Sequence, residues 1–119
     1  MYGLPSTFNT SFLLEKDLES VCFSAFHVSF IFSEKVWIQV EGQCILMHKG
    51  TTIEKIYSFP IVQSMLPQLV GKRVQKVTFE PASGDLTIDW EGDYRLVVVG
   101  DYGPYEAYKI FDGSSETIV

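Results

Sequence analysis

An alternating pattern of apolar and polar residues between Leu69 and Gly100 constrains the fold more than any other feature of this sequence. Three runs alternate with a period of two, and turn-forming residues at 81–84 and 91–93 separate them. This pattern is typical of short antiparallel strands that bury one face. We therefore predict a three-stranded antiparallel meander in this stretch.

The same pattern occurs earlier in the chain. A shift of 56 positions aligns Leu69–Lys72 with Leu13–Lys16, and a shift of 58 aligns the later strands and brings Gly100 onto Gly42. Identities are few, so a chance likeness between two meanders is the alternative. Because a repeat decides the whole fold, we predict an internal duplication with pseudo-repeats 13–58 and 69–119.

Each pseudo-repeat is predicted to hold a helical turn and five strands. Beyond the first meander, residues 44–48 and 52–57 read as a hairpin. Its counterpart joins residues 105–111 to 115–119 through Asp112-Gly113, a strong hairpin signal. Between the halves, residues 58–69 are the best helix candidate.

The predicted fold is a single domain of residues 1–119, mainly β (α+β) and antiparallel. It is a sandwich or partly open barrel with one or two short helices. A single highly curved sheet is the alternative. The predicted core consists of inward-facing residues of both meanders: Phe30, Phe32, Ile38, Val77, Phe79, Ile88, Trp90 and Leu96.

Charge and hydropathy exclude several classes of function. A net charge of −6 disfavours nucleic acid as a partner, because phosphates need a basic surface. No apolar run approaches the roughly 18 residues of a membrane span, and the N-terminus lacks the pattern of a signal peptide. Two cysteines in such a chain favour free thiols in a reducing cytoplasm.

Three short segments carry a resemblance: Tyr2-Gly3-Leu4-Pro5, Leu69-Val70-Gly71-Lys72 and Tyr105-Glu106-Ala107-Tyr108. Together they resemble a family of small uncharacterised bacterial proteins with a YGLP-like lead and a C-terminal YExY strand. The resemblance covers nearly the whole chain and implies no activity. By analogy, some small proteins of this kind resemble immunity proteins carried beside polymorphic toxins, which assigns no residues here.

Two groups of side chains are candidates for metal binding or acid–base chemistry. Cys22, His27, Cys44 and His48 supply ligand types that suit zinc, but their spacing lacks the tight, loop-borne pairs of zinc ribbons and fingers. We expect no metal and no cofactor. Asp85 and Asp89 share a strand face and would suit acid–base chemistry or a cation. Solvated charge on an outward strand face explains them more simply.

Aromatic residues favour recognition instead. Tyr102, Tyr105 and Tyr108 lie close in sequence beside Glu106, and tyrosine suits contact surfaces. The alternative is that Tyr108 fills the core. Aromatic side chains next to carboxylates would suit a basic protein partner.

Several apolar residues occupy positions where the alternation calls for polar ones: Phe26, Ile31, Trp37, Val97 and Val99. We predict that one set forms a protein contact surface, most simply in a symmetric homodimer, with Trp37 in it.

The preferred function is a non-enzymatic protein-interaction module, such as an immunity-type inhibitor of a basic toxin. The alternative is a small ligand-binding barrel or an enzyme that uses the acidic strand face. The residues singled out for binding are Trp37, Ile31, Tyr102, Tyr105, Glu106, Tyr108, Asp85 and Asp89.

Overall fold

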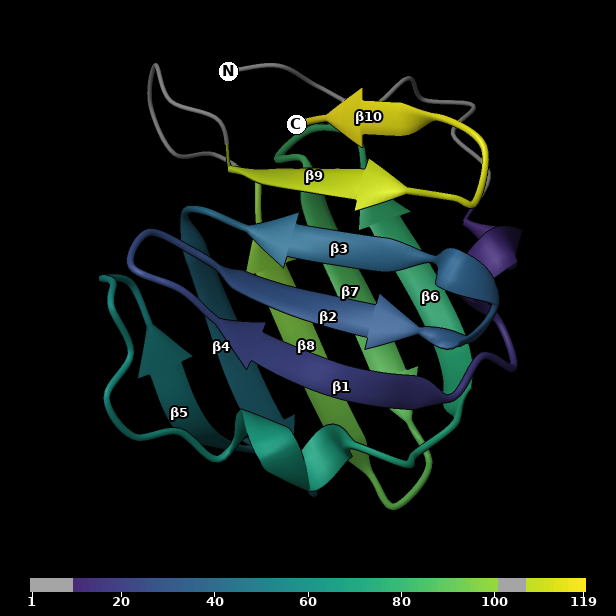
Figure 1. Ribbon diagram of the computed structural model, residues 1–119. Helices are drawn as coiled ribbons and strands as arrows, with labels where there is room; N and C mark the ends of the chain where they lie inside the picture. Colours follow the sequence, from purple (N-terminus) through teal and green to yellow (C-terminus); the bar gives the residue numbers. More distant parts are fainter. Residues whose placement is uncertain (1–9, 101–106) are drawn as a thin grey trace.

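Two five-stranded antiparallel sheets pack face to face in the computed structural model, which describes residues 10–100 and 107–119 (Figure 1). In spatial order the first sheet contains β1 (Leu18–Phe23), β2 (Val28–Phe32), β3 (Trp37–Val40), β9 (Tyr108–Phe111) and β10 (Glu116–Ile118). The second contains β5 (Thr51–Ile56), β4 (Gln43–His48), β8 (Tyr94–Val99), β7 (Asp85–Trp90) and β6 (Val74–Glu80). The strands of the two layers cross steeply in Figure 1. Each sheet keeps two edge strands, so the predicted antiparallel sandwich is confirmed and the barrel is not closed.

The core lies between the sheets and is built by the predicted alternation. Residues 85–90 and 28–32 are buried at every second position, so one face of each strand is apolar and the other half-exposed. Phe32 and Trp90 stack at its centre, with ring centroids 6.3 Å apart. Six of the eight predicted core residues are buried: Phe30, Phe32, Ile38, Ile88, Trp90 and Leu96.

The prediction of full burial is wrong for Val77 and Phe79, which are only partly buried. Both lie on β6, at the edge of the second sheet, where one flank has no neighbouring strand. The alternation identified their face correctly but carries no information about edge position.

The helices are three short 3-10 turns, η1 (Ser11–Leu13), η2 (Ser33–Lys35) and η3 (Leu66–Leu69). A helix over 58–69 is therefore wrong except for its last turn. Glu54 on β5 accepts hydrogen bonds from the Met65 amide and the Ser64 hydroxyl, both at 2.9 Å, and the Leu66 amide donates to Ser64 Oγ. These side chains satisfy amides that a helix would otherwise pair. No helix in the described part of the chain has the length and apolarity to cross a membrane.

The topology has a pseudo-two-fold symmetry. In one sheet, the β9–β10 hairpin of the second half pairs with the edge of the β1–β2–β3 meander of the first half. In the other sheet, the β4–β5 hairpin of the first half pairs with the edge of the β6–β7–β8 meander of the second half. Even the registers correspond: Ile31 pairs with Trp37 and Trp37 with Phe111 in one sheet, and Asp89 pairs with Arg95 and Arg95 with Met47 in the other. We call residues equivalent when they hold the same place in these two registers or in the turns that connect them.

The two halves also contact each other reciprocally near Asp17 and Arg73, which form an isolated antiparallel bridge. The Leu18 amide donates to the Lys72 carbonyl at 3.0 Å, and the Val74 amide donates to the Lys16 carbonyl at 2.9 Å. Each bond becomes the other when the halves are exchanged, as in a contact across a two-fold axis.

Positive φ angles recur at equivalent positions: Glu15 with Gly71, Glu34 with Gly92, Lys35 with Asp93 and Lys49 with Gly113. These correspondences are what an internal duplication predicts. The duplication itself stays a prediction, and a superposition of residues 13–58 on 69–119 would test it.

Candidate functional site

An apolar row crosses the outer face of the first sheet. Ile31 on β2, Trp37 on β3 and Phe111 on β9 are register neighbours, and each side chain is half-buried. The Trp37 and Phe111 rings stack with centroids 5.6 Å apart and an interplanar angle of 17°. We call these three residues the aromatic row. It places two of the residues singled out from the sequence, Ile31 and Trp37, in direct register.

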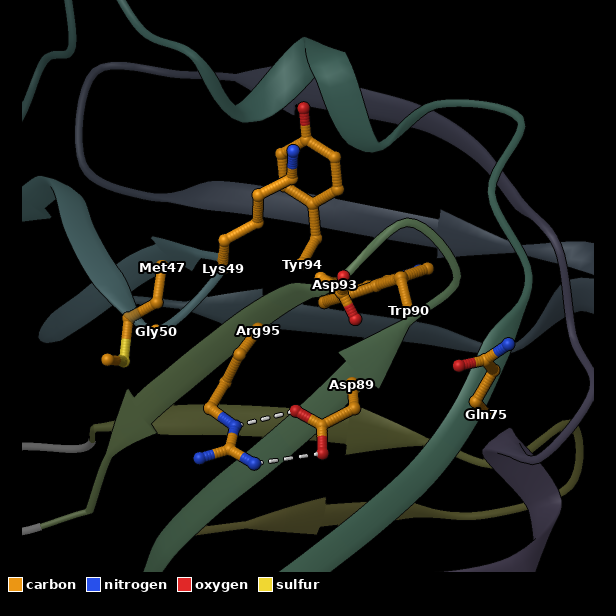
Figure 2. A pocket seen from close by; sticks show the side chains of 9 residues that line it. All are labelled: Met47, Lys49, Gly50, Gln75, Asp89, Trp90, Asp93, Tyr94 and Arg95. Atoms are coloured by element: carbon orange, nitrogen blue, oxygen red, sulfur yellow. Dashed lines mark hydrogen bonds and ion pairs between the residues drawn. The ribbon is translucent and has the colours of Figure 1, made fainter.

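The equivalent row of the second sheet has a different chemistry. There Asp89, Arg95 and Met47 replace the isoleucine, tryptophan and phenylalanine. Arg95 Nε and Nη2 donate to the two carboxylate oxygens of Asp89 at 2.7 and 3.2 Å (Figure 2). The equivalent register position in the second sheet therefore holds a bidentate ion pair in place of the stacked rings.

Exposed carboxylates surround the aromatic row. Glu116 pairs with Phe111, Asp112 follows it, Glu34 lies in the turn between β2 and β3, and Glu19 lies at the bulge before the Ser20–Ile31 pair. Two lysines lie beside these carboxylates: Lys35 is exposed in the β2–β3 turn, and the Lys16 ammonium lies 2.7 Å from Oε2 of Glu34. The rim of the row is therefore acidic.

Asp85 and Asp89, which the sequence named as binding candidates and as an alternative for acid–base chemistry, both have partners within the chain. Asp85 accepts a hydrogen bond from the Gly100 amide at 2.8 Å, and Asp89 is bound by Arg95. They lie four residues apart on one strand, about 13 Å along it. The paired carboxylates of glycoside hydrolases lie roughly 5–9.5 Å apart, so this pair does not match that geometry.

Tyr108 belongs to the core and not to a recognition surface. It is fully buried, and its hydroxyl donates to the Gly84 carbonyl at 2.7 Å. Burial, followed by the charge of Asp85, raises the pKa of this phenol above its usual range. The interpretation of Tyr108 as a binding residue is therefore wrong. Tyr102, Tyr105 and Glu106 lie outside the described residues.

The cysteines and histidines do not form a cluster in the described part of the chain. Cys22 is exposed on β1, whereas Cys44 is buried on β4 of the other sheet. Burial raises the pKa of the Cys44 thiol to about 12, and the charge of Glu54 adds to the shift. Within residues 10–100 and 107–119, no group of three potential ligands could hold a metal ion.

A shallow open hollow of about 660 Å³ lies on the second sheet near the β4–β5 and β7–β8 turns (Figure 2). Lys49, Asp93, Tyr94 and Arg95 are among its lining residues. His48 stacks on Tyr94 with centroids 4.0 Å apart, and the Tyr94 hydroxyl donates to Gln68 at 3.0 Å. The Lys72 ammonium lies 5.2 Å from the centre of the same ring.

Sequence reasoning missed Phe111 and the group around Tyr94. Phe111 is out of phase with buried Tyr108 and Ile110, and that signal would have placed it on the outer face. The Tyr94 group has no local signal, because His48 lies on β4, Tyr94 on β8 and Lys72 in the loop before β6.

No family model matches this sequence, and searches of curated proteins and of solved structures give no match.

Proposed function

We propose that this chain is a non-enzymatic protein-binding module whose contact surface is the aromatic row of the first sheet. One observation supports the proposal: the equivalent row of the second sheet is an ion pair with a methionine, whereas Trp37 and Phe111 form a half-exposed aromatic stack. Tryptophan is one of the residue types enriched among those that dominate binding energy.

The partner that fits is a basic protein. The carboxylates of Glu19, Asp112 and Glu116 at the rim would attract positive charge, whereas Glu34 is already paired with Lys16, and the net charge of the chain is −6. Such complementarity mainly raises the association rate and selects the partner, while the aromatic row supplies affinity. An inhibitor of a basic toxin would meet these requirements. A reducing cytoplasm, which keeps Cys22 and Cys44 as thiols, is the setting we propose.

Three immobilised proteins test the proposal: the wild type, Trp37→Glu, and Thr87→Glu. The last adds the same charge to the outer face of the second sheet, where Thr87 is half-buried. A cell extract is passed over each, and proteins retained by the wild type are identified, purified and titrated by calorimetry. We expect a basic protein that binds the wild type and Thr87→Glu equally. Trp37→Glu should weaken it by 2 kcal/mol or more, roughly 30-fold in Kd, and added salt should slow its association.

A partner that binds all three proteins equally would contradict the assignment of the aromatic row. An acidic or neutral partner would contradict the role of the rim. Analytical ultracentrifugation tests the homodimer directly: self-association lost in Trp37→Glu would make a second copy of this chain the occupant and would refute the basic partner.

A further inference from the structure

Lys16 and Lys72 hold equivalent positions but have different surroundings. Their carbonyls accept the two reciprocal hydrogen bonds from Val74 and Leu18, at 2.9 and 3.0 Å. The backbone thus places both lysines alike with respect to the axis between the halves. Any difference between their side-chain contacts comes from the residues around them.

In the first half, the lysine is paired. The Lys16 ammonium lies 2.7 Å from Oε2 of Glu34, which stands in the β2–β3 turn with φ of 62°. A carboxylate of the chain itself therefore occupies this position. Glu34 keeps most of its surface exposed, so the pair lies at the rim of the molecule.

In the second half, the carboxylate is missing. The residue equivalent to Glu34 is Gly92, in the β7–β8 turn with φ of 83°. Among residues 10–100 and 107–119, no carboxylate comes within 4.0 Å of the Lys72 ammonium. The ammonium lies instead over the Tyr94 ring.

A Cβ atom fits beside Lys72 at Gly92, although the φ of +83° strains any residue other than glycine there. A Cβ atom at Gly92 would lie 3.8 Å from the Lys72 ammonium and 3.5 Å from Tyr94 Cδ2, both ordinary van der Waals distances. A carboxylate could thus approach Lys72 in this half as Glu34 approaches Lys16 in the other. The first half thus pairs its lysine with its own carboxylate, and the second half, in the described residues, does not.

We propose that the surface formed by Lys72, Gly92 and Tyr94 binds a carboxylate supplied by a ligand. One exposed ion pair contributes little to binding, so the ligand needs a second contact. Lys49 lines the adjoining hollow together with Tyr94, and it also has no ion-pair partner in the part of the chain that the structure describes. A ligand with two carboxylates would place the second one near Lys49, in a hollow that Asp89 and Asp93 also line.

This site is independent of the aromatic row, because it lies on the turns of the second sheet. Two sources supply the same chemistry: a free dicarboxylate, or neighbouring glutamates of a peptide segment. The two sources are distinguished by which binds with the lower Kd, a free dicarboxylate or a peptide with two glutamates.

The test is an NMR titration of the isotope-labelled protein with glutarate, against sodium chloride of the same ionic strength. We expect saturable shifts at the Gly92 amide and at the side-chain methylenes of Lys72, with roughly millimolar affinity. Lys72→Gln should weaken binding at least 10-fold. Lys76→Gln, which removes an exposed lysine on β6, should leave it unchanged.

Two exchanges between the halves sharpen the test. Gly92→Glu should fill the site from within and lower the affinity for glutarate at least 10-fold. Glu34→Gly should create a second saturable site, reported by the methylenes of Lys16. A denaturation curve shows whether each variant folds, and the second exchange tests the idea even if the first does not fold.

A peptide with two glutamates, acetyl-Glu-Gly-Glu-amide, is titrated in parallel. Tighter binding of the peptide would assign the site to an acidic protein segment, and tighter binding of glutarate to a small dicarboxylate. Shifts that do not saturate, that chloride reproduces, or that persist in both Lys72→Gln and Gly92→Glu would overturn the proposal.

Discussion

Replacing Gly100 with alanine is expected to destabilise the fold by about 3–5 kcal/mol. A Cβ atom at Gly100 would lie 2.2 Å from the carbonyl carbon of Gly84 and 2.3 Å from its oxygen. Backbone atoms, unlike the ends of flexible side chains, yield only if the whole turn moves. Ordinary contact begins at 3.4 Å, so the turn before β7 would have to move by roughly 1 Å.

The magnitude follows from what that movement breaks. The Tyr108 hydroxyl donates to the Gly84 carbonyl at 2.7 Å in the core, and the Gly100 amide donates to Asp85 Oδ1 at 2.8 Å. Leaving a buried group unpaired costs about 1–3 kcal/mol, and a hydrogen bond to a charged group contributes about 1.5–3 kcal/mol. Small domains have a total stability of about 5–15 kcal/mol, so the variant loses a large share of it.

Urea denaturation followed by circular dichroism measures the effect. With slopes of about 1–3 kcal/mol per molar urea, the midpoint should fall by at least about 1 M. Gly50→Ala is the control: Gly50 has φ of +78° but nothing within 4 Å of its Cβ position, so it reports backbone strain alone, about 1–2 kcal/mol. Tyr108→Phe isolates the phenol hydrogen bond. A Gly100→Ala midpoint no lower than that of Gly50→Ala would refute the steric argument.

Three further predictions concern the core and the division of the chain. Phe79→Ala should cost clearly less than the roughly 3–5 kcal/mol expected of Phe30→Ala, because Phe79 is only partly buried on an edge strand; equal urea midpoints would contradict this. The pKa of Cys44 is raised from 9.0 to about 12 by burial and then by a nearby carboxylate, so stability should fall as pH rises from about 9 toward 12; an equally steep fall in Cys44→Ala would contradict it. Residues 1–62 and 63–119, made separately, should form one complex in gel filtration, because each half supplies a hairpin to the other's sheet; two independently folded fragments would contradict it.

The strands of the meanders were predictable because their signal is local. Alternation with a period of two identifies an inward and an outward face wherever one side of a strand is buried. Residues 85–90 show this directly: Leu86, Ile88 and Trp90 are buried and the three between them are half-exposed. The pairing of the hairpins was not predictable in the same way. β9 joins β3 across nearly 70 residues, and no local pattern specifies so distant a partner.

The prediction of a helix over 58–69 is wrong for the same physical reason, because a contact with a distant part of the chain decides the structure. Pro60 and the spacing of the apolar residues favour a helix locally. Glu54, on a strand that precedes this segment, accepts hydrogen bonds from the Met65 amide and the Ser64 hydroxyl. A tertiary contact therefore decides the backbone conformation, and propensity alone does not reveal it.

The two candidate sites also differ in whether a local sequence pattern identifies them. Trp37 and Ile31 were found from the sequence because they break the alternation of their own strands. The group around Lys72 was not found, because its distinguishing feature is a missing carboxylate at Gly92, and that becomes visible only by comparison with Glu34.

Equivalent positions in the two halves distinguish residues that the fold needs for packing from residues that it does not need. Phe32 and Trp90 are equivalent, buried and apolar, and they stack on each other at the centre of the core. Positions that keep their chemical class in both halves, as these do, are explained by packing. Trp37 and Arg95 differ in chemical class on one backbone geometry, so packing alone does not explain the difference.

A double exchange tests this reasoning on the aromatic row. Ile31→Asp combined with Trp37→Arg introduces an aspartate–arginine pair into the first sheet. Asp89 and Arg95 form this pair at the equivalent register position of the second sheet, where Arg95 Nε lies 2.7 Å from Asp89 Oδ1. The double variant should keep its urea midpoint closer to the wild type than Ile31→Asp alone, because the single change leaves a carboxylate without its arginine. It should also lose the partner that the wild type binds, since the apolar contact area is gone. A double variant that unfolds would show that Trp37 is needed for packing, and one that keeps the partner would show that binding occurs elsewhere.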